Sequence, residues 1–386
     1  MNPTRAEIDL TKLEYNFRSV RRFVNKNSLK QKIKICGVVK ANAYGHGIQK
    51  ISEKLVSLGV DYLGVANYDE AIKLRPIIPD TKILVFGTLI HSKLKPATYV
   101  AKLLKHNLIA TVASLETARF LDYYSRKSGK KFKVHIKIDT GMRRIGFDVK
   151  RAYKNVLQVI SYKNLNVEGI YTHFATAEMK DKTFAKVQLN KFNELLYTLA
   201  KEGVEFPIVH AANSAAIINL KDSYFNMVRP GLLLYGYYPS DDIEKKVDIK
   251  PIMSFRSKVT YIKRVDANTS ISYGRTYFTK KKTFIGSIPV GYGDGYWRAF
   301  SNKGKVIING KLYPIVGIIT MDWLMVDLGE KTDVKVGDEV LLIGKQNGLD
   351  MGANVIAKMV NTIPYEILTA IADRVPRVYI YNNKKM

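Results

Sequence analysis

The chain has 386 residues, of which 62 are Lys or Arg and 34 are Asp or Glu, so its formal net charge is +28. Hydrophobic residues make up 46% of the sequence, which suits a folded core and excludes a chain that is mainly disordered. The single cysteine, Cys36, excludes a disulfide framework and a multi-cysteine metal site. No apolar run approaches the ~20 residues of a membrane span, and no secretory leader is visible. We expect a cytoplasmic protein without a membrane partner.

The positive charge has two interpretations. A nucleic-acid-binding protein would gather its basic residues in a tract or a basic helix. Here they are scattered in short groups such as Arg21-Arg22 and Lys130-Lys131, and the sequence contains no zinc-finger or RNP motif. We therefore expect no specific nucleic-acid partner, although the positive field would attract an anionic small molecule.

The first two thirds of the chain alternate short apolar runs with amphipathic stretches. Apolar runs rich in β-branched residues are typical of strands that are buried on both faces. The pattern predicts strands at 33–39, 62–66, 82–86, 108–112, 132–138, 167–172, 208–211 and 227–228. It predicts helices at 48–58, at 69–74, from the N-cap Ser114 to about Ser128, and at 184–201. Repeated β-then-α units, about eight in number, predict a (β/α)8 barrel of the TIM type. A doubly wound sheet is disfavoured, because no G-x-G-x-x-G follows the first strand.

After Gly236 the pattern changes to short strand-like runs that are separated by Gly, Asn and Asp turn signals. The predicted strands are 254–265, 284–289, 305–308, 324–328 and 339–343, and only 365–372 looks helical. The polar segment 237–247 is the expected boundary. We therefore predict a barrel domain at residues 1–243 and a mainly β domain at residues 244–386.

In a barrel of this type, functional residues lie where the strands end at the C-terminal face. Lys40 directly follows the first apolar strand, where a lysine tends to have a lowered pKa and can form a Schiff base; a solvated lysine at the barrel rim is the alternative. Hydroxyls and backbone N–H groups suit an anion such as phosphate. Together these groups favour pyridoxal 5′-phosphate, an aldehyde with a phosphate arm. The strand ends and the residues beside them supply Lys40, Tyr44, Arg144, His173, His210, Asn213, Ser214, Arg229, Gly231 and Leu232.

The string VVKANAYGHG at 38–47 closely resembles the cofactor-lysine motif of the alanine racemases, which are pyridoxal-phosphate enzymes with a barrel followed by a β domain. The resemblance covers nearly the whole chain. Further strings that resemble those of the family follow in the same order: KIDTGMRRIG, GIYTHFATAE, HAANSAA, FNMVRPGLLLYG, SYGRTY, VGYGDGY, TMDW and RVPR. The resemblance implies interconversion of L-alanine and D-alanine by two-base proton transfer. It also implies a supply of D-alanine for peptidoglycan and a homodimer with shared active sites.

The resemblance assigns the two bases and their support. Lys40 would carry the cofactor as an internal aldimine and act on one face of the substrate Cα. Tyr273 of the partner subunit would act on the other face, so that the substrate need not rotate. A tyrosine titrates near ~10, so Tyr273 would need nearby positive charge, which the pair of Arg229 and His173 would supply. Arg229 would also donate to the pyridine nitrogen.

The same resemblance places the remaining site residues. Arg144 would bind the substrate carboxylate, and Lys137 matches a lysine that is carbamylated in some members and braces that arginine. Tyr292 would narrow the entrance to the site. The cofactor phosphate would lie against Tyr44, Ser214, Gly231 and Leu232, Asn213 would line the cofactor site, and Met321 and Asp322 of the partner subunit would help to hold the substrate.

The sequence departs from the family pattern at four positions. Arg143 stands where glycine is usual, Ile318 stands where an entrance arginine is common, and Thr320 replaces a frequent cysteine. Asp373 stands where some members place a tyrosine near the phosphate, and Arg374 is a candidate ion-pair partner for it. These departures leave open a racemase that prefers serine or a basic amino acid such as lysine or ornithine.

Two other classes of protein share parts of this pattern. A fold-related amino-acid decarboxylase would need a C-terminal nucleophile motif, but the only cysteine is Cys36, beside the first strand. A non-catalytic pyridoxal-phosphate-binding protein would consist of the barrel alone, whereas this chain has a second domain. Both are therefore less favoured than a racemase.

Overall fold

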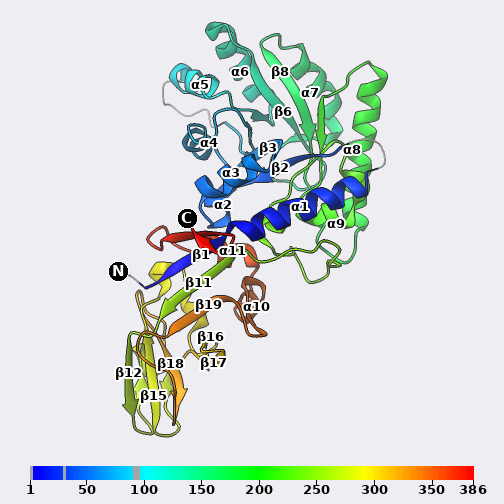
Figure 1. The fold of residues 1–386 in the computed structure, drawn as a ribbon. Coiled ribbons are helices and arrows are strands. Elements are labelled where there is room, and N and C mark those ends of the chain that lie inside the picture. The colour runs from blue at the N-terminus through cyan, green and yellow to red at the C-terminus, as the bar shows by residue number, and fades with distance from the viewer. Residues whose placement is uncertain (1–2, 29–31, 90–95) are drawn as a thin grey trace.

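The computed structural model describes residues 3–28, 32–89 and 96–386, and it confirms a parallel barrel followed by a mainly β region (Figure 1). Parallel pairing gives two sets of strands, in the orders β10-β2-β3-β4 and β5-β6-β8-β9. A bridge between Leu84 and Ile109 joins the sets on one side, and a 2.9 Å bond from Arg229 N to Ala212 O joins them on the other. The barrel strands are β2 (Lys34–Val38), β3 (Tyr62–Val65), β4 (Lys82–Val85), β5 (Ala110–Val112), β6 (Phe132–Asp139), β8 (Leu165–Tyr171), β9 (Ile208–His210) and β10 (Met227–Val228).

Helices follow the barrel strands, as the repeated unit predicts. The helix that begins after Ser114 is confirmed: the Ser114 hydroxyl accepts a 3.2 Å bond from Thr117 N, and the helix ends at Ser128. The sequence analysis did not predict α1, α2, α5, α7 or α9. The helices of the barrel are α1 (Leu10–Lys26), α2 (Lys40–Tyr44), α3 (Ile48–Ser57), α4 (Tyr68–Leu74), α5 (Pro96–Lys105), α6 (Leu115–Ser128), α7 (Val149–Ser161), α8 (Thr183–Lys201) and α9 (Ser214–Asn219), and a short strand β7 (Phe147–Asp148) pairs with β6.

The C-terminal region is mainly β, as predicted. Its strands form a large sheet, a three-stranded sheet β12-β15-β18 and the small pair β13-β14. The strands are β11 (Met253–Lys258), β12 (Tyr261–Val265), β13 (Ser270–Ile271), β14 (Tyr277–Phe278), β15 (Thr283–Ile288), β16 (Lys305–Ile308), β17 (Lys311–Pro314), β18 (Leu324–Gly329), β19 (Glu339–Gln346), β20 (Leu349–Met351), β21 (Arg377–Tyr381) and β22 (Lys384–Lys385), and the helices are α10 (Ala353–Met359) and α11 (Pro364–Thr369).

Two predictions for this region were wrong. The run 254–265 is not one strand, because the chain leaves the large sheet at Val259 and enters the three-stranded sheet as β12; the N–H of Thr260 already bonds to Ser287 O at 3.0 Å. A helix is also present before 365–372, because α10 packs three buried apolar residues, Ala353, Ile356 and Ala357, onto the core.

The N-terminal strand β1 (Arg5–Asp9) was not anticipated. It pairs antiparallel with β11 and parallel with β21, so it lies inside the large sheet of the C-terminal region. Figure 1 shows this blue strand beside the green β11, below the barrel. The predicted boundary segment 237–247 contains no helix or strand, although Tyr237, Ile243 and Val247 are buried.

The backbone is left-handed directly after Lys40. Residues 41–44 have φ between 51° and 54°, a region in which each non-glycine residue costs about 1–2 kcal/mol. Hydrogen bonds from outside the turn offset this cost. They join Ala41 N to Glu70 Oε1 at 2.8 Å, Ile48 N to Asn42 Oδ1 at 2.8 Å, Arg377 Nε to Gly45 O at 3.1 Å and Tyr379 Oη to His46 O at 3.3 Å.

None of the described helices combines the length and the apolar character that crossing a bilayer requires.

The left-handed turn gives a prediction about stability. Ala41 is exposed, so Ala41→Gly should raise the free energy of unfolding by about 1 kcal/mol, because glycine adopts this backbone without steric cost. The same change at the exposed Ala101 in the right-handed helix α5 should lower it by about 0.5–1 kcal/mol. Thermal unfolding of both variants checks the prediction, and a lower Tm for Ala41→Gly would contradict it.

Candidate active site

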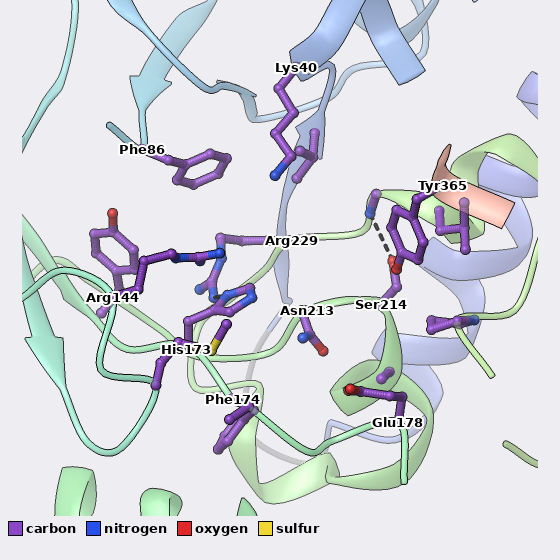
Figure 2. Close-up of a pocket in the computed structure, with 18 of the residues that line it drawn as sticks. Lys40, Phe86, Arg144, His173, Phe174, Glu178, Asn213, Ser214, Arg229 and Tyr365 are labelled. Carbon is purple, nitrogen blue, oxygen red and sulfur yellow. Dashed lines mark hydrogen bonds between the residues drawn. The ribbon is translucent and has the colours of Figure 1, made fainter. Parts of the chain in front are cut away.

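A cavity of about 540 Å³ opens among the residues that follow the barrel strands. Figure 2 shows side chains from several of these loops pointing into it. Every site residue that was predicted within the barrel lines this cavity: Lys40, Tyr44, Lys137, Arg144, His173, Asn213, Ser214, Arg229, Gly231 and Leu232.

Lys40 provides an amine in the cavity. It lies between β2 and the left-handed residues 41–44, and in Figure 2 its nitrogen points towards Arg229. Burial, and then the charge of Arg144, lower the pKa of Lys40 below its ordinary value. A lowered pKa increases the fraction of neutral amine, which is the form that attacks an aldehyde carbon.

Arg229 is buried at the side of the cavity and is held from several directions. Its Nη1 donates to Nδ1 of His210 at 2.7 Å, and its Nη2 lies 3.2 Å from Nδ1 of His173. Nη2 also reaches the carbonyl oxygens of Thr172 at 2.9 Å and Ala211 at 2.8 Å. Burial lowers the pKa of Arg229 to about 10, so the guanidinium keeps its proton near neutral pH.

His173 is a neutral imidazole. Burial, and then the charge of Arg229, hold its pKa well below the ordinary value. Because Arg229 can only donate, Nδ1 of His173 accepts and the ring proton sits on Nε2. The positive charge that we expected from the pair of Arg229 and His173 therefore lies on Arg229 alone.

A group of hydroxyls and N–H groups forms one end of the cavity. The Ser214 hydroxyl accepts a 2.9 Å bond from the N–H of Gly231, and Asn213 caps α9 through a 3.0 Å bond from Ala216 N. A Cβ at Gly231 would lie 2.5 Å from the Tyr44 hydroxyl oxygen, so only glycine lets Tyr44 reach this place without a shift. The donors converge as a phosphate site requires.

The side chains of Arg143 and Arg144 point to different places. Arg144 lines the cavity, whereas Arg143 bonds to Asp148 at 2.7 Å outside it. Arg143 has a φ of 56°, in the left-handed region that favours glycine. This backbone explains the glycine that the family pattern usually has here, and the ion pair with Asp148 lets an arginine occupy the position without entering the cavity.

Lys137 is buried beside two arginines. Its Nζ lies 4.5 Å from the ring centroid of Tyr171 and has no hydrogen-bond partner among the residues that the structure describes. Burial, and then the charges of Arg229 and Arg144, lower the pKa of Lys137 well below its ordinary value. The lowered pKa increases the neutral fraction of Lys137, whose Nζ lies in the cavity wall without a partner among the described residues.

The sequence analysis gave no role to three residues that shape the site. Tyr365 of α11 lines the cavity beside Ser214, and its ring centroid lies 5.9 Å from that of Tyr44 (Figure 2). Tyr171 stacks on His210 with centroids 4.5 Å apart and planes 7° apart. An aromatic at the start of a short helix, or at the end of a strand, is usually a core residue, so the local sequence carried no signal for Tyr365 or Tyr171. His210 was noted only as a strand end.

The other predicted residues lie outside the cavity, on the C-terminal region. Tyr273, Tyr292 and Met321 expose 73%, 44% and 53% of their surface, and Asp322 is also exposed. Tyr292, Met321 and Asp322 lie together, because Tyr292 N bonds to Thr320 O and Gly293 N bonds to Met321 O. The structure thus does not bring these residues to Lys40 of the same chain.

The expected ion pair of Asp373 with Arg374 was wrong. Asp373 does not line the described cavity wall, and the tyrosine in that wall is Tyr365. Arg374 does not pair with Asp373, because its guanidinium binds Asp294 at 2.9 Å and Asp322 at 2.8 Å and so has two carboxylate partners already. Asp373 is exposed near Asn42.

The departures Ile318 and Thr320 also lie on the C-terminal region, outside the described cavity wall. The carbonyl of Ile318 accepts a 2.6 Å bond from the hydroxyl of Ser272, which is next to Tyr273. The hydroxyl of Thr320 accepts a 3.0 Å bond from Trp323 N. Both residues therefore support the surface that carries Tyr273 and Met321.

Comparison with known proteins identifies the family. Residues 8–239 match the family model of the alanine racemase N-terminal domain, and residues 252–379 match that of the C-terminal domain. Alanine racemase 2 of Caldanaerobacter subterraneus is 42% identical over 385 residues, which cover 100% of this chain and 96% of that protein. An alanine racemase structure from Clostridium difficile 630 gives a TM-score of 0.92 at 39% identity, covering 100% of this chain and 98% of that one. One from Bartonella henselae with covalently bound pyridoxal phosphate gives 0.85 at 30% identity, covering 98% and 100%. The chain belongs to the alanine racemase family.

Proposed function

We propose that the barrel cavity interconverts L-alanine and D-alanine with the help of pyridoxal 5′-phosphate. The observation that carries this proposal is the placement of the Lys40 amine opposite the buried, fixed guanidinium of Arg229 in one cavity. The use of the product D-alanine for peptidoglycan and the cytoplasmic location stay predictions.

The residues present fit the cofactor. The hydroxyls of Tyr44 and Ser214 and the backbone at Gly231 and Leu232 form the place for a phosphate, and Lys40 supplies the amine for an aldehyde. When bound, the cofactor supplies an aldehyde that links to amines and a ring that draws electrons from the substrate Cα. Arg229 would donate an N–H to the ring nitrogen and would leave that nitrogen without a proton of its own.

Two bases on opposite faces of the substrate Cα carry out the proton transfer in this proposal. Lys40 removes or returns the proton on the face that its own barrel presents. Tyr273 of the partner subunit serves the other face. The Nε2–H of His173 would donate to the hydroxyl oxygen of Tyr273, and the positive charge of Arg229 would act from the other side of His173. Arg144, at the cavity wall, would bind the substrate carboxylate.

The second base requires a homodimer. Tyr273 is 73% exposed and Met321 is 53% exposed, so both side chains are accessible to a partner subunit. Tyr273 also sits in a constrained turn, where Ser272 has a φ of 65° and Arg275 a φ of 49°.

The charges in the cavity favour alanine over a basic substrate. The two guanidiniums of Arg144 and Arg229 face one carboxylate, Glu178, in the described wall. A cationic side chain would be repelled by this excess of positive charge. The alternative of a basic or serine substrate depended on Asp373 and Ile318, and neither lines the described wall.

Lys137 is the residue that we propose is modified. Its neutral amine can add to carbon dioxide: the Nζ–C bond forms, the amine loses one proton, and a carbamate with one negative charge results. The carbamate would place a carboxylate-like group beside Arg144 and Arg229, whose charges act on Lys137. It would also replace an amine that has no partner among the described residues with oxygen acceptors for nearby donors.

The activity itself can be tested by exchange of the α-hydrogen in D2O, followed by NMR. L-alanine should exchange and invert faster than serine, lysine or arginine, because the cavity is cationic and a pocket-level discrimination of about 1–3 kcal/mol is ordinary. Lys40→Ala should abolish both the exchange and the yellow colour near ~420 nm that a bound cofactor gives. Faster turnover of lysine or serine than of alanine would overturn the substrate assignment.

The shared site can be tested by mixing two inactive variants. Lys40→Ala and Tyr273→Phe should each be inactive, and subunit exchange between them should restore roughly a quarter of wild-type activity, because half of the dimers are mixed and each mixed dimer has one intact site. Mixing Lys40→Ala with Lys40→Arg is the control and should restore nothing. Absence of recovery after verified subunit exchange would mean that each site lies within one chain.

The modification of Lys137 can be tested with 13C-labelled bicarbonate. Wild-type protein should show a carbamate signal in its 13C NMR spectrum, and Lys137→Gln should lack that signal while keeping the fold. The surface variant Lys133→Gln, on the same strand, is the control and should retain the signal. A wild-type spectrum without the signal, at saturating bicarbonate, would show that Lys137 stays an amine.

A further inference from the structure

A chain of polar side chains leads from Arg229 through the interior of the barrel. Arg229 Nη1 donates to Nδ1 of His210 at 2.7 Å, and Nε2 of His210 lies 2.9 Å from Nδ1 of His135. Nε2 of His135 faces Oε2 of Glu168 at 3.9 Å, and Glu168 forms a 2.8 Å ion pair with Lys82. The chain thus crosses strands β9, β6, β8 and β4.

The direction of donation along this chain is determined from both ends. A guanidinium can only donate, so Nδ1 of His210 accepts and its proton must sit on Nε2. That proton is donated to Nδ1 of His135, which leaves the proton of His135 on Nε2. At the far end, the carboxylate of Glu168 can only accept, so it favours the same tautomer.

Three observations indicate that this arrangement is built into the fold. His210 and His135 are fully buried, and neither His135 Nε2 nor Glu168 Oε2 has a hydrogen-bond partner among the described residues, so that at 3.9 Å these two atoms face only each other. A Cβ at Gly169 would lie 2.9 Å from the His135 ring, so glycine there makes room for the imidazole. Arg229 has no carboxylate partner within the described part of the chain. The two imidazoles instead connect Arg229 to the carboxylate of Glu168.

We propose that His135 and Glu168 are positioning residues, which fix the Nε2–H tautomer of His210 and so hold Arg229 in place. With the other tautomer, His210 would point an N–H at the guanidinium, and the 2.7 Å bond would be lost. The guanidinium would then be free to turn from its place at the cavity. The part of this proposal that concerns the cofactor ring rests on the proposed function, whereas the part that concerns the tautomers does not.

Substitutions of Glu168 and Lys82 test the proposal. In Glu168→Gln, Lys82 should donate to the oxygen of the new amide, so that the amide NH2 faces His135. Nε2 of His135 should then accept from this NH2, and the proton of His135 should move to Nδ1. Lys82→Met should change nothing, because the carboxylate remains an acceptor. The double variant Glu168→Gln with Lys82→Met should recover the wild-type tautomer, because the amide oxygen can now turn to His135. Glu339→Gln, which alters a surface ion pair with Arg5 and Arg256, is the matched control.

The measurement is 15N NMR of histidine-labelled protein with its cofactor bound; the chain has 6 histidines, and single substitutions assign the signals. Wild type should show bare Nδ1 and protonated Nε2 for both His135 and His210. In Glu168→Gln this pattern should be lost, kcat for alanine should fall by about tenfold to a hundredfold, as for other partners that orient a working side chain, and KM should stay within a few-fold.

Several outcomes would overturn the proposal. They are a protonated Nδ1 on His210 in wild type, an unchanged tautomer in Glu168→Gln, or equal effects of Lys82→Met and Glu168→Gln. The wild-type spectrum tests the tautomer of His210 even if Glu168→Gln does not fold. If the tautomers behave as expected but wild type does not racemise alanine, the proposed function fails and the assignment of the tautomers stands.

Discussion

The left-handed backbone at residues 41–44 is the constraint on which the site depends. Lys40, which directly precedes this segment, and Tyr44, its last residue, both line the cavity although only three residues separate them. The strain of this segment is offset by Glu70 on one side and by Arg377 and Tyr379 on the other. The C-terminal region thus helps to hold the segment of the barrel that directly follows Lys40.

The cavity gathers basic side chains, whose positive charges repel one another. Arg229 and Lys137 are buried without an ion pair among the described residues, and both lie over the ring of Tyr171, at 5.4 Å and 4.5 Å from its centroid. Buried charge is tolerated only where hydrogen bonds or partners compensate. Carbonyl oxygens compensate for Arg229, whereas for Lys137 the pKa is lowered instead. Burial first, and then the positive field that suits a phosphate, lower the pKa of both lysines in the cavity.

Local pattern predicts the barrel residues of the site well, because each follows a strand and the closure of the barrel brings strand ends together. The sequence could identify Ser214 and Arg229 in this way. It could not identify Tyr365, which reaches the cavity from a helix of the other region. Nor could it predict β1, whose partners are about 250 and 370 residues away in the chain. The wrong partner for Arg374 has the same cause, because its carboxylates come from Asp294 and Asp322.

The position of β1 inside the large sheet affects how the chain can fold and where it can be truncated. β21 joins that sheet through β1, so two strands that lie about 370 residues apart in the chain pair with each other. The sheet therefore cannot be completed before both β1 and β21 have been synthesised. Cutting the chain after the barrel would remove an inner strand from the sheet. The two regions therefore share one cooperative unit at this sheet, and neither is a module that could be exchanged without the other.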